Sequence, residues 1–262
     1  MNSKEQLQQK AKEVVAFTIL ANEYIHGRTN NLCPVTGAAH PVVMEKSASD
    51  RPGKGEAFIM NFLVLVNKDH PLPSGWEEAL DTVKTVNSVG DEVEAERRTY
   101  EAYLLLKKDL EEHDDIRTEL DSGWRSVAMQ QEILDRYTAK YGADYASKVV
   151  APPGFSEHHT GLALDLYYRL RNRDGSFRDI YYNEEMEQYP EIWDRIHARL
   201  AAHGFILRYP KDQEQLTGYT YEPWHIRYVG DPAIAKEIMS RPGMTLEEWL
   251  LVKSMPKMPG SG

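Results

Sequence analysis

The sequence predicts an α+β fold in which a small antiparallel sheet packs on helices. Helix-patterned segments precede and separate short strand-like runs, and Gly161 and Gly218 mark turns between the later runs. The length of 262 residues suits one large domain, or one domain with an appendage. We therefore expect a domain over residues 61–262, preceded by an N-terminal helical extension and a long loop over residues 1–60.

The first half of the chain is expected to be mainly helical. Residues 4–26 form an amphipathic pattern that ends at Gly27, and residues 30–57 are rich in turn residues, which indicates a long surface excursion. The apolar run from residue 58 predicts a short strand, followed by a proline-bounded turn. The remaining elements expected here are a helix over 94–115, a strand and turn over 118–126, and a helix over 127–150.

The second half alternates strands with helices. TGLALDLYY (160–168) predicts a strand, and residues 183–204 predict a helix that Gly204 ends. FILRYP (205–210) and WHIRYVG (224–230) are expected to be strands on either side of a loop. Two short helices, over 231–240 and 245–254, complete the prediction.

Composition excludes several classes of protein. The chain carries 31 basic and 41 acidic residues, a net charge of −10, which argues against nucleic-acid binding. The single cysteine, Cys33, excludes an internal disulfide and a zinc site built from several cysteines. No apolar run reaches the length of a membrane-spanning helix. The sequence as written is expected to be cytoplasmic, or to belong to the cell envelope if its native N-terminus lies further upstream.

The stretch GFSEHHTGLALDLYY (154–168) carries the first candidate ligands. If it is a strand from Thr160 onward, Leu162, Leu164 and Leu166 share one face and should pack on helices. Asp165 then lies on the opposite face. The turn at Thr160–Gly161 would return the imidazole of His158 to a place beside that carboxylate. Two such ligands hold a metal weakly, so a third is required.

The stretch YEPWHIRYVG (221–230) offers the third ligand. Pro223 interrupts regular pairing, which allows Glu222 and His225 to face one site although they are three residues apart. His158, Asp165 and His225 would provide two nitrogens and one oxygen with an open fourth position, as in hydrolytic zinc sites. Glu222 is then placed to act as a general base. Spacing alone leaves this constellation suggestive, because a turn stabilised by hydrogen bonds is the simpler reading.

The stretch DSGWRS supplies a cation for hydrolysis. Arg125 follows a glycine turn, and its permanently charged guanidinium suits an oxyanion that develops on a carbonyl. Nothing in the local spacing brings it to the metal, and a salt bridge to Glu132 or Asp121 is the alternative.

Three motifs in order, SGWRS, GFSEHHTGLALDL and YEPWHIRYVG, closely resemble the VanY-type D-alanyl-D-alanine carboxypeptidases, zinc peptidases of peptidoglycan metabolism in the hedgehog/DD-peptidase-like superfamily. FLVLVNKDHPLP and GFILRYPKD extend the similarity to about residues 62–230. The resemblance implies one zinc ion on His158, Asp165 and His225, Glu222 as catalytic base, and Arg125 as stabiliser of the tetrahedral intermediate. It further implies that His159, at a position often occupied by glutamine, is not a ligand, and that the fold is a small α+β domain with the metal on an antiparallel sheet.

Five further residues are candidates for substrate binding: Ser156, Gln130, Arg208, Tyr209 and Trp224. Ser156 would orient a ligand or bind substrate, and a local helix cap is an equal alternative. Arg208 would pair with the carboxylate of a peptide, although an ordinary ion pair explains it equally well. For Gln130, Tyr209 and Trp224, plain packing is the alternative to lining a peptide groove.

The function predicted is a zinc-dependent D,D-carboxypeptidase that removes the C-terminal D-Ala from a peptidoglycan stem pentapeptide or its precursor. An L,D-carboxypeptidase, a D-Ala-D-Ala dipeptidase and an endopeptidase share the same zinc chemistry and remain alternatives. A zinc-containing module that only binds a wall peptide, and a binding domain without metal, are the alternatives of another class. Glu222 and Arg125 favour an enzyme, because binding alone requires neither.

Overall fold

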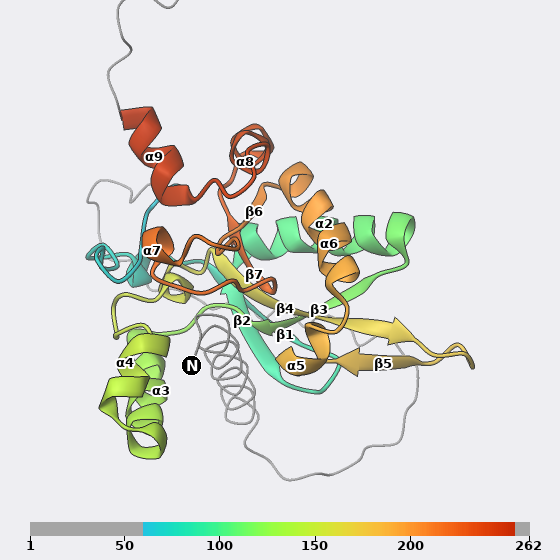
Figure 1. The fold of residues 1–262 in the computed structure, drawn as a ribbon, viewed down its shortest axis with the longest axis horizontal. Helices are drawn as coiled ribbons and strands as arrows, with labels where there is room; N and C mark the ends of the chain where they lie inside the picture. Colours follow the sequence, from blue (N-terminus) through green and yellow to red (C-terminus); the bar gives the residue numbers. More distant parts are fainter. Residues whose placement is uncertain (1–59, 255–262) are drawn as a thin grey trace, which may run out of the picture.

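A five-stranded antiparallel sheet lies at the centre of the protein (Figure 1). The structure, a computed structural model, describes residues 60–254. The strands lie in the order β3-β4-β7-β6, and β5 pairs with the outer part of β4. Their bounds are β3 Arg117–Ser122, β4 Ala163–Arg171, β5 Phe177–Ile180, β6 Phe205–Leu207 and β7 His225–Tyr228. The predicted α+β class is confirmed, whereas β5 was not predicted.

A separate two-stranded hairpin also escaped prediction. It consists of β1 (Thr82–Val86) and β2 (Glu92–Glu96), which pair antiparallel. Its turn is attached to the main sheet, because Asn87 Nδ2 donates to Leu120 O at 3.0 Å and Ser88 Oγ lies 2.6 Å from Tyr167 Oη. The hairpin therefore covers the end of β3 from which the SGWRS stretch emerges.

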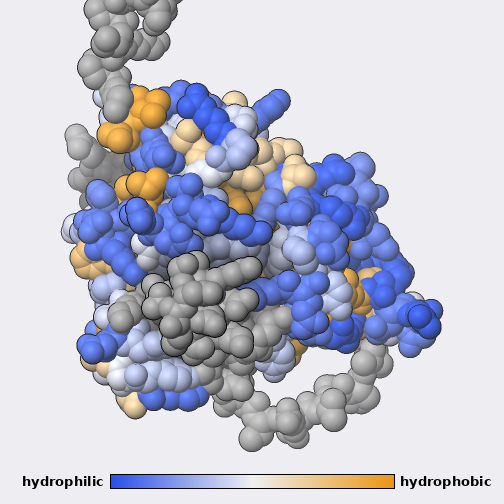
Figure 2. All heavy atoms as spheres, viewed as in Figure 1, coloured by the Kyte–Doolittle hydropathy of each residue, from blue (hydrophilic) through white to orange (hydrophobic). Residues whose placement is uncertain are grey.

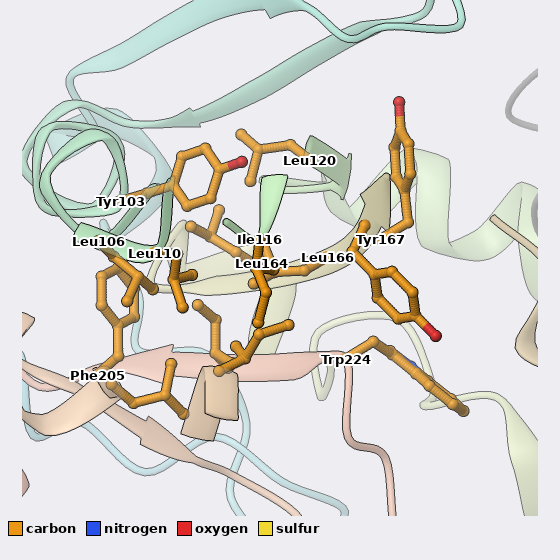
Figure 3. Close-up of a cluster of buried hydrophobic side chains, with 14 of the residues drawn as sticks. Tyr103, Leu106, Leu110, Ile116, Leu120, Leu164, Leu166, Tyr167, Phe205 and Trp224 are labelled. Atoms are coloured by element: carbon orange, nitrogen blue, oxygen red, sulfur yellow. The ribbon is translucent and has the colours of Figure 1, made fainter. Parts of the chain in front are cut away.

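Helices pack on one side of the sheet to form the main core. Helix α2 (Arg97–Asp114) and helix α6 (Pro190–Leu200), extended by the 3₁₀ turn η3 (Ala201–His203), contribute buried apolar side chains to it. Figure 3 shows side chains of α2 meeting those of β3 and β4, with Leu164 and Leu166 inside the cluster. The predicted leucine face of β4 is therefore confirmed for these two residues. Leu162 instead belongs to a second cluster around Trp76.

The remaining helices frame the sheet. Residues 127–150, expected as one helix, divide at Gly142 into α3 (Val127–Tyr141) and α4 (Ala143–Val149). Residues 183–204 divide at Pro190, which begins α6 as a first-turn proline commonly does, and Gly204 ends the segment in the left-handed conformation. The other elements are η1 Glu77–Ala79, η2 Glu157–Thr160, α5 Asn183–Met186, α7 Glu214–Thr217, α8 Pro232–Met239 and α9 Leu246–Ser254.

The strand predicted from residue 58 is wrong over its described part. Residues 60–73 form turns, with one isolated bridge between Asn67 and His70. The carbonyls of Phe62 and Val64 accept hydrogen bonds from Arg227 Nη2 at 2.9 and 2.8 Å, so a side chain satisfies the groups that a neighbouring strand would otherwise pair. Met60, Val64 and Val66 of this run still pack inward, in the cluster around Trp76.

Several other predictions lie outside the described residues. These are the helix over 4–26, the excursion over 30–57, and with them the extension assigned to residues 1–60. Within residues 60–254, no helix is long and apolar enough to cross a membrane. The face in Figure 2 is largely hydrophilic, and apolar residues gather over α9, where Leu251 and Val252 are exposed.

Candidate metal centre

His158, Asp165 and His225 converge on one point of the main sheet. Asp165 and His225 are paired residues of β4 and β7, and His158 lies on η2, which Gly161 joins to β4 through a left-handed turn at φ 71°. One ligand atom from each side chain lies within 4.8 Å of the others. His158 Nε2 is 3.1 Å from Asp165 Oδ2, and His225 Nδ1 is 2.9 Å from Asp165 Oδ1.

Each imidazole is held by a hydrogen bond at its other nitrogen. His158 Nδ1 lies 2.6 Å from the carbonyl oxygen of Gly123 and donates to it, which leaves the Nε2 lone pair directed at Asp165. His225 Nε2 lies 3.1 Å from Glu157 Oε2 and donates to that carboxylate, which leaves Nδ1 directed at Asp165. The two histidines therefore present opposite nitrogens to the same point, and the hydrogen-bonding partners select the tautomers.

The electrostatics of this point favour a positive charge. Burial opposes the ionisation of Asp165, but His158 and His225 outweigh it and hold the pKa of this carboxyl well below its usual range. Burial lowers the pKa of His225, yet the carboxylates of Asp165 and Glu157 raise it overall to about 9. Burial and the nearby Arg125 guanidinium lower the pKa of His158 to about 4. A bound cation would pair with the Asp165 carboxylate, while each imidazole keeps only the proton on the nitrogen that faces away from it.

The donor set fits one zinc ion. Zinc takes imidazole nitrogen and carboxylate oxygen at about 2.0–2.2 Å, and tetrahedral ligands at such distances lie about 3.3 Å apart, close to the separations found here. Among the residues that the structure describes, His158, Asp165 and His225 form the group of metal-binding side chains that could hold one ion. Three protein ligands with a fourth position open are typical of a catalytic rather than a structural zinc site.

Glu222 lies beside this group. Its Oε2 is 3.8 Å from His225 Nδ1, the nitrogen that faces Asp165. Burial raises the pKa of Glu222 to about 7, so the carboxyl can exchange a proton near neutral pH. The irregular backbone expected at Pro223 is present, and the His197 ring of α6 lies 2.9 Å from the Pro223 carbonyl and donates to it through Nε2. The predicted grouping of Glu222 with His225 thus exists in the fold.

Arg125 reaches the same point from the loop after β3. Its Nη2 is 3.7 Å from Asp165 Oδ2, and its Nη1 lies 3.4 Å from Gln130 Oε1. The loop is pressed against the β1–β2 hairpin, because a Cβ added at Gly123 would collide with the carbonyl oxygen of Glu94. Packing between segments that are distant in the sequence therefore brings Arg125 to the candidate metal centre, which local spacing could not predict.

His159 has a structural position next to the ligand His158. Its Nδ1 donates to the Arg125 carbonyl at 2.7 Å, and its Nε2 accepts from the Gly154 amide at 3.1 Å. Both ring nitrogens are thereby engaged away from the metal point. Burial lowers the pKa of His159, in keeping with the neutral ring that this pair of bonds requires.

The five substrate-binding candidates differ in their surroundings. The Tyr209 ring lies against His225 with centroids 4.7 Å apart, and Gln130 touches Arg125 while its Nε2 donates to Ala151 O at 2.9 Å. Ser156 is buried one residue before Glu157 and makes no capping hydrogen bond, so its interpretation as a helix cap is wrong. Trp224 packs inside the main core.

Arg208 does not fit a role in binding a substrate carboxylate. It is fully buried, with Nε 2.8 Å from Glu157 Oε1 and its two terminal nitrogens 2.9 and 2.6 Å from the oxygens of Glu247. Arg208 does form a bidentate pair with a carboxylate, but that carboxylate is Glu247 of the protein and not a substrate.

Glu157 is a residue beside the candidate metal centre that sequence reasoning missed. It is 3% exposed and binds His225, Arg208 and Arg227 together. Its partners lie 51 to 70 residues away in the chain, so local spacing gives no sign of them. The available signal was an acidic residue directly before a predicted ligand.

The chain is similar to proteins of one family. It matches the family model described as VanY, D-alanyl-D-alanine carboxypeptidase, over residues 92–231. The bifunctional D-Ala-D-Ala dipeptidase and D-Ala-D-Ala carboxypeptidase VanXYC of Enterococcus gallinarum is 32% identical over 194 residues, which cover 72% of this chain and 94% of that protein.

Two solved structures are similar to this fold. One is a mutant of the vancomycin resistance D,D-pentapeptidase VanY from a VanB-type resistance cassette in complex with Zn(II), with a TM-score of 0.55, 31% identity, and coverage of 72% of this chain and 98% of the other. The second is the LD-carboxypeptidase LdcB, with a TM-score of 0.58, 31% identity, and coverage of 73% and 86%.

Proposed function

The chain belongs to the VanY family of zinc D-alanyl-D-alanine carboxypeptidases, and we propose that it removes the C-terminal D-Ala from peptidoglycan stem pentapeptides or their precursors. One observation carries this proposal. The three candidate ligands, a carboxyl able to exchange a proton near pH 7, and an arginine all meet at one point of the sheet. Binding alone would need neither of the last two groups, so the arrangement supports an enzyme.

His158, Asp165 and His225 would hold the metal through Nε2, a carboxylate oxygen and Nδ1. When bound there, zinc supplies a Lewis acid that polarises a carbonyl and acidifies water to a pKa of about 7. The chain's own contribution is to fix both imidazoles through Gly123 and Glu157, so that the ligand lone pairs already converge.

Glu222 is proposed as the general base and then the general acid. It would accept a proton from the attacking water as a C–O bond forms at the carbonyl before the terminal residue. When the C–N bond breaks, Glu222 would return that proton to the leaving amine of D-Ala. A raised pKa suits this double role, because the group must both take and give a proton near neutral pH.

Arg125 is proposed to stabilise the negative charge that develops on the carbonyl oxygen. Its guanidinium already faces Asp165 at 3.7 Å, and Gln130 holds one side of it. A charged donor fixed in advance costs no reorganisation during the reaction, and losing such a donor typically costs about 3–4 kcal/mol of barrier. Ser156 and Tyr209 are proposed to contact the peptide, since they adjoin η2 and His225.

The catalytic unit is proposed to be larger than the matched residues 92–231. The segment before the match supplies the carbonyls of Phe62 and Val64 to Arg227, and α9 after it supplies Glu247 to Arg208. Both contacts end on side chains that adjoin the candidate metal centre. The predicted domain over 61–262 is therefore retained as a proposal.

The test is mass spectrometry of the products formed from a stem pentapeptide that ends in D-Ala-D-Ala. Loss of one alanine that a chelator abolishes, and that zinc restores, is the expected result. Glu222→Gln should lower kcat by about 10²–10⁴-fold while retaining zinc, because it removes the proton acceptor and keeps the shape. Glu214→Gln, an exposed change on α7, is the matched control and should keep full activity.

An intact pentapeptide would contradict the D,D-carboxypeptidase proposal, and full activity in Glu222→Gln would contradict its base. Parallel reactions with a tetrapeptide and with the dipeptide D-Ala-D-Ala test the L,D-carboxypeptidase and dipeptidase alternatives. These deserve their own reactions because the similar proteins include an LD-carboxypeptidase and a bifunctional dipeptidase.

A further inference from the structure

A buried charge cluster lies directly behind the candidate metal centre. We define it as Glu157, Arg208, Arg227 and Glu247. Glu157 is 3% exposed, and both arginines are 0% exposed. The cluster contains two positive and two negative side chains, so its formal charges cancel. Buried charges are tolerated only when paired and hydrogen-bonded, and each guanidinium here meets at least one carboxylate.

We propose that Glu157 is a positioning residue for the metal ligand His225, and that Glu247 on α9 holds Glu157 in that role through Arg208. The C-terminal helix thereby becomes part of the device that sets metal affinity. This inference rests on the zinc site of the proposed function.

The contact to His225 determines which nitrogen that residue offers. Glu157 Oε2 accepts from His225 Nε2 at 3.1 Å, so the proton stays on Nε2 and Nδ1 faces Asp165. A carboxylate partner also makes the imidazole a stronger electron donor than a neutral acceptor would. Without this contact the ring could take the other tautomer or rotate away, and the site would lose a preformed ligand.

Arg208 and Arg227 fix the position of the Glu157 carboxylate. Its Oε1 accepts from Arg208 Nε at 2.8 Å and from Arg227 Nη1 at 2.5 Å, which leaves Oε2 for His225. Arg227 is itself tied to the carbonyls of Phe62 and Val64 at 2.9 and 2.8 Å. Two arginines therefore hold the carboxylate of Glu157, whose other oxygen accepts from His225.

Glu247 connects this arrangement to the C-terminal helix. Its two carboxylate oxygens accept hydrogen bonds from the two terminal nitrogens of Arg208 in a bidentate pair. Oε1 also accepts from Asn67 Nδ2 at 3.1 Å. The helix is anchored by Leu246 and Trp249, which pack in one cluster with Ile206 of β6 and Ile238 of α8. α8 and α9 lie at the same end of the molecule, above β6 (Figure 1).

The test compares zinc affinity in five full-length proteins: wild type, Glu157→Gln, Glu247→Gln, the double variant of these two, and the control Glu237→Gln. Glu237 on α8 forms an exposed ion pair with Lys253 of α9, so the control also removes one carboxylate contact to α9 but lies outside the cluster. Affinity is measured by competition with a chromophoric chelator, and the d–d spectrum of the Co²⁺ form reports ligand geometry. Melting of the metal-free proteins is recorded in parallel.

Glu157→Gln should weaken zinc binding by about 10–100-fold and shift the cobalt spectrum. Glu247→Gln should weaken it by about 3–10-fold, because it acts through two intervening side chains, and the double variant should lose less than the product of the two single losses. Glu237→Gln should match wild type.

Variants that melt earlier but bind zinc with unchanged affinity would overturn the inference, because the cluster would then serve stability alone. If Glu157→Gln does not fold, the zinc affinity of Glu247→Gln alone tests the inference. That variant should fold, because the Glu247 side chain is 14% exposed and glutamine has the same shape. A wild type that binds no zinc would overturn both the metal site and this inference. A wild type that binds zinc but releases no D-Ala would contradict the proposed substrate only.

Discussion

The two histidines of the candidate metal centre are held in opposite ways. His158 donates to a backbone carbonyl, that of Gly123, in a loop that packs against the β1–β2 hairpin. His225 donates to a side-chain carboxylate, Glu157, which a buried charge cluster holds in place. The His158 side, which we call the backbone-held half, thus depends on the path of the backbone. The His225 side, which we call the side-chain-held half, depends on charges that must stay paired. The two halves should fail in different ways when they are mutated.

The largest effect is expected where a charge is removed from the side-chain-held half. Arg208→Met leaves the buried Glu157 and the partly buried Glu247 without their shared cation, and breaking one partner of a buried pair costs about 3–5 kcal/mol. The control is Lys84→Met in the exposed pair with Glu92, which should cost less than about 1 kcal/mol. Denaturant unfolding measures both. Equal losses in the two variants would contradict the dependence of the His225 side on buried, paired charges.

A steric change should disturb the backbone-held half. In Gly123→Ala the added Cβ would meet the Glu94 carbonyl oxygen, which cannot rotate away, so we expect a loss of about 3 kcal/mol together with weaker zinc binding. Gly175→Ala in the β4–β5 turn is the comparison, because its φ of 87° brings strain but its added Cβ meets no neighbour. That variant should bind zinc like wild type. Normal zinc affinity in Gly123→Ala would show that the carbonyl does not position His158.

The smallest of the three effects concerns His159, which supports the backbone-held half without touching the metal point. His159→Leu removes the donor to the Arg125 carbonyl and the acceptor for the Gly154 amide, for which we expect a loss of about 1–2 kcal/mol. His159→Gln can replace both bonds and should cost less. The measurement is the difference in unfolding free energy between the two variants, with zinc content as a second reading. A leucine variant that matches the glutamine variant would mean that these bonds contribute nothing.

Periodicity and turn residues were sufficient for the elements that carry the site. Strand β4 was predicted from its alternation, and Leu164 and Leu166, on either side of Asp165, share one core cluster with buried side chains of α2. Gly161 and Gly204 were recognised as turn and stop positions, and both adopt left-handed conformations there. The ligand trio was reached because motif order and the chemistry of histidine and carboxylate both pointed to it, and the fold brings the three side chains together.

What escaped prediction depends on partners that are distant in the chain. The β1–β2 hairpin is short and charged, and its turn is held by Leu120 and Tyr167, about 30 to 80 residues onward. The apolar run after residue 58 suggested a strand, yet its carbonyls bind Arg227. For Arg208, substrate binding and an ion pair within the protein were equal alternatives, because its carboxylate partners, Glu157 and Glu247, lie 51 and 39 residues away. Local patterns carry no information about such pairings.

The most direct test of the account is a crystal structure of the zinc-loaded protein, with anomalous data collected at the zinc edge. One zinc ion should lie about 2.0–2.2 Å from His158 Nε2, His225 Nδ1 and one oxygen of Asp165, with Glu157 still bound to His225 Nε2. Zinc bound to His225 through Nε2, or zinc held at a place that excludes Asp165, would contradict both the ligand set and the role assigned to the charge cluster.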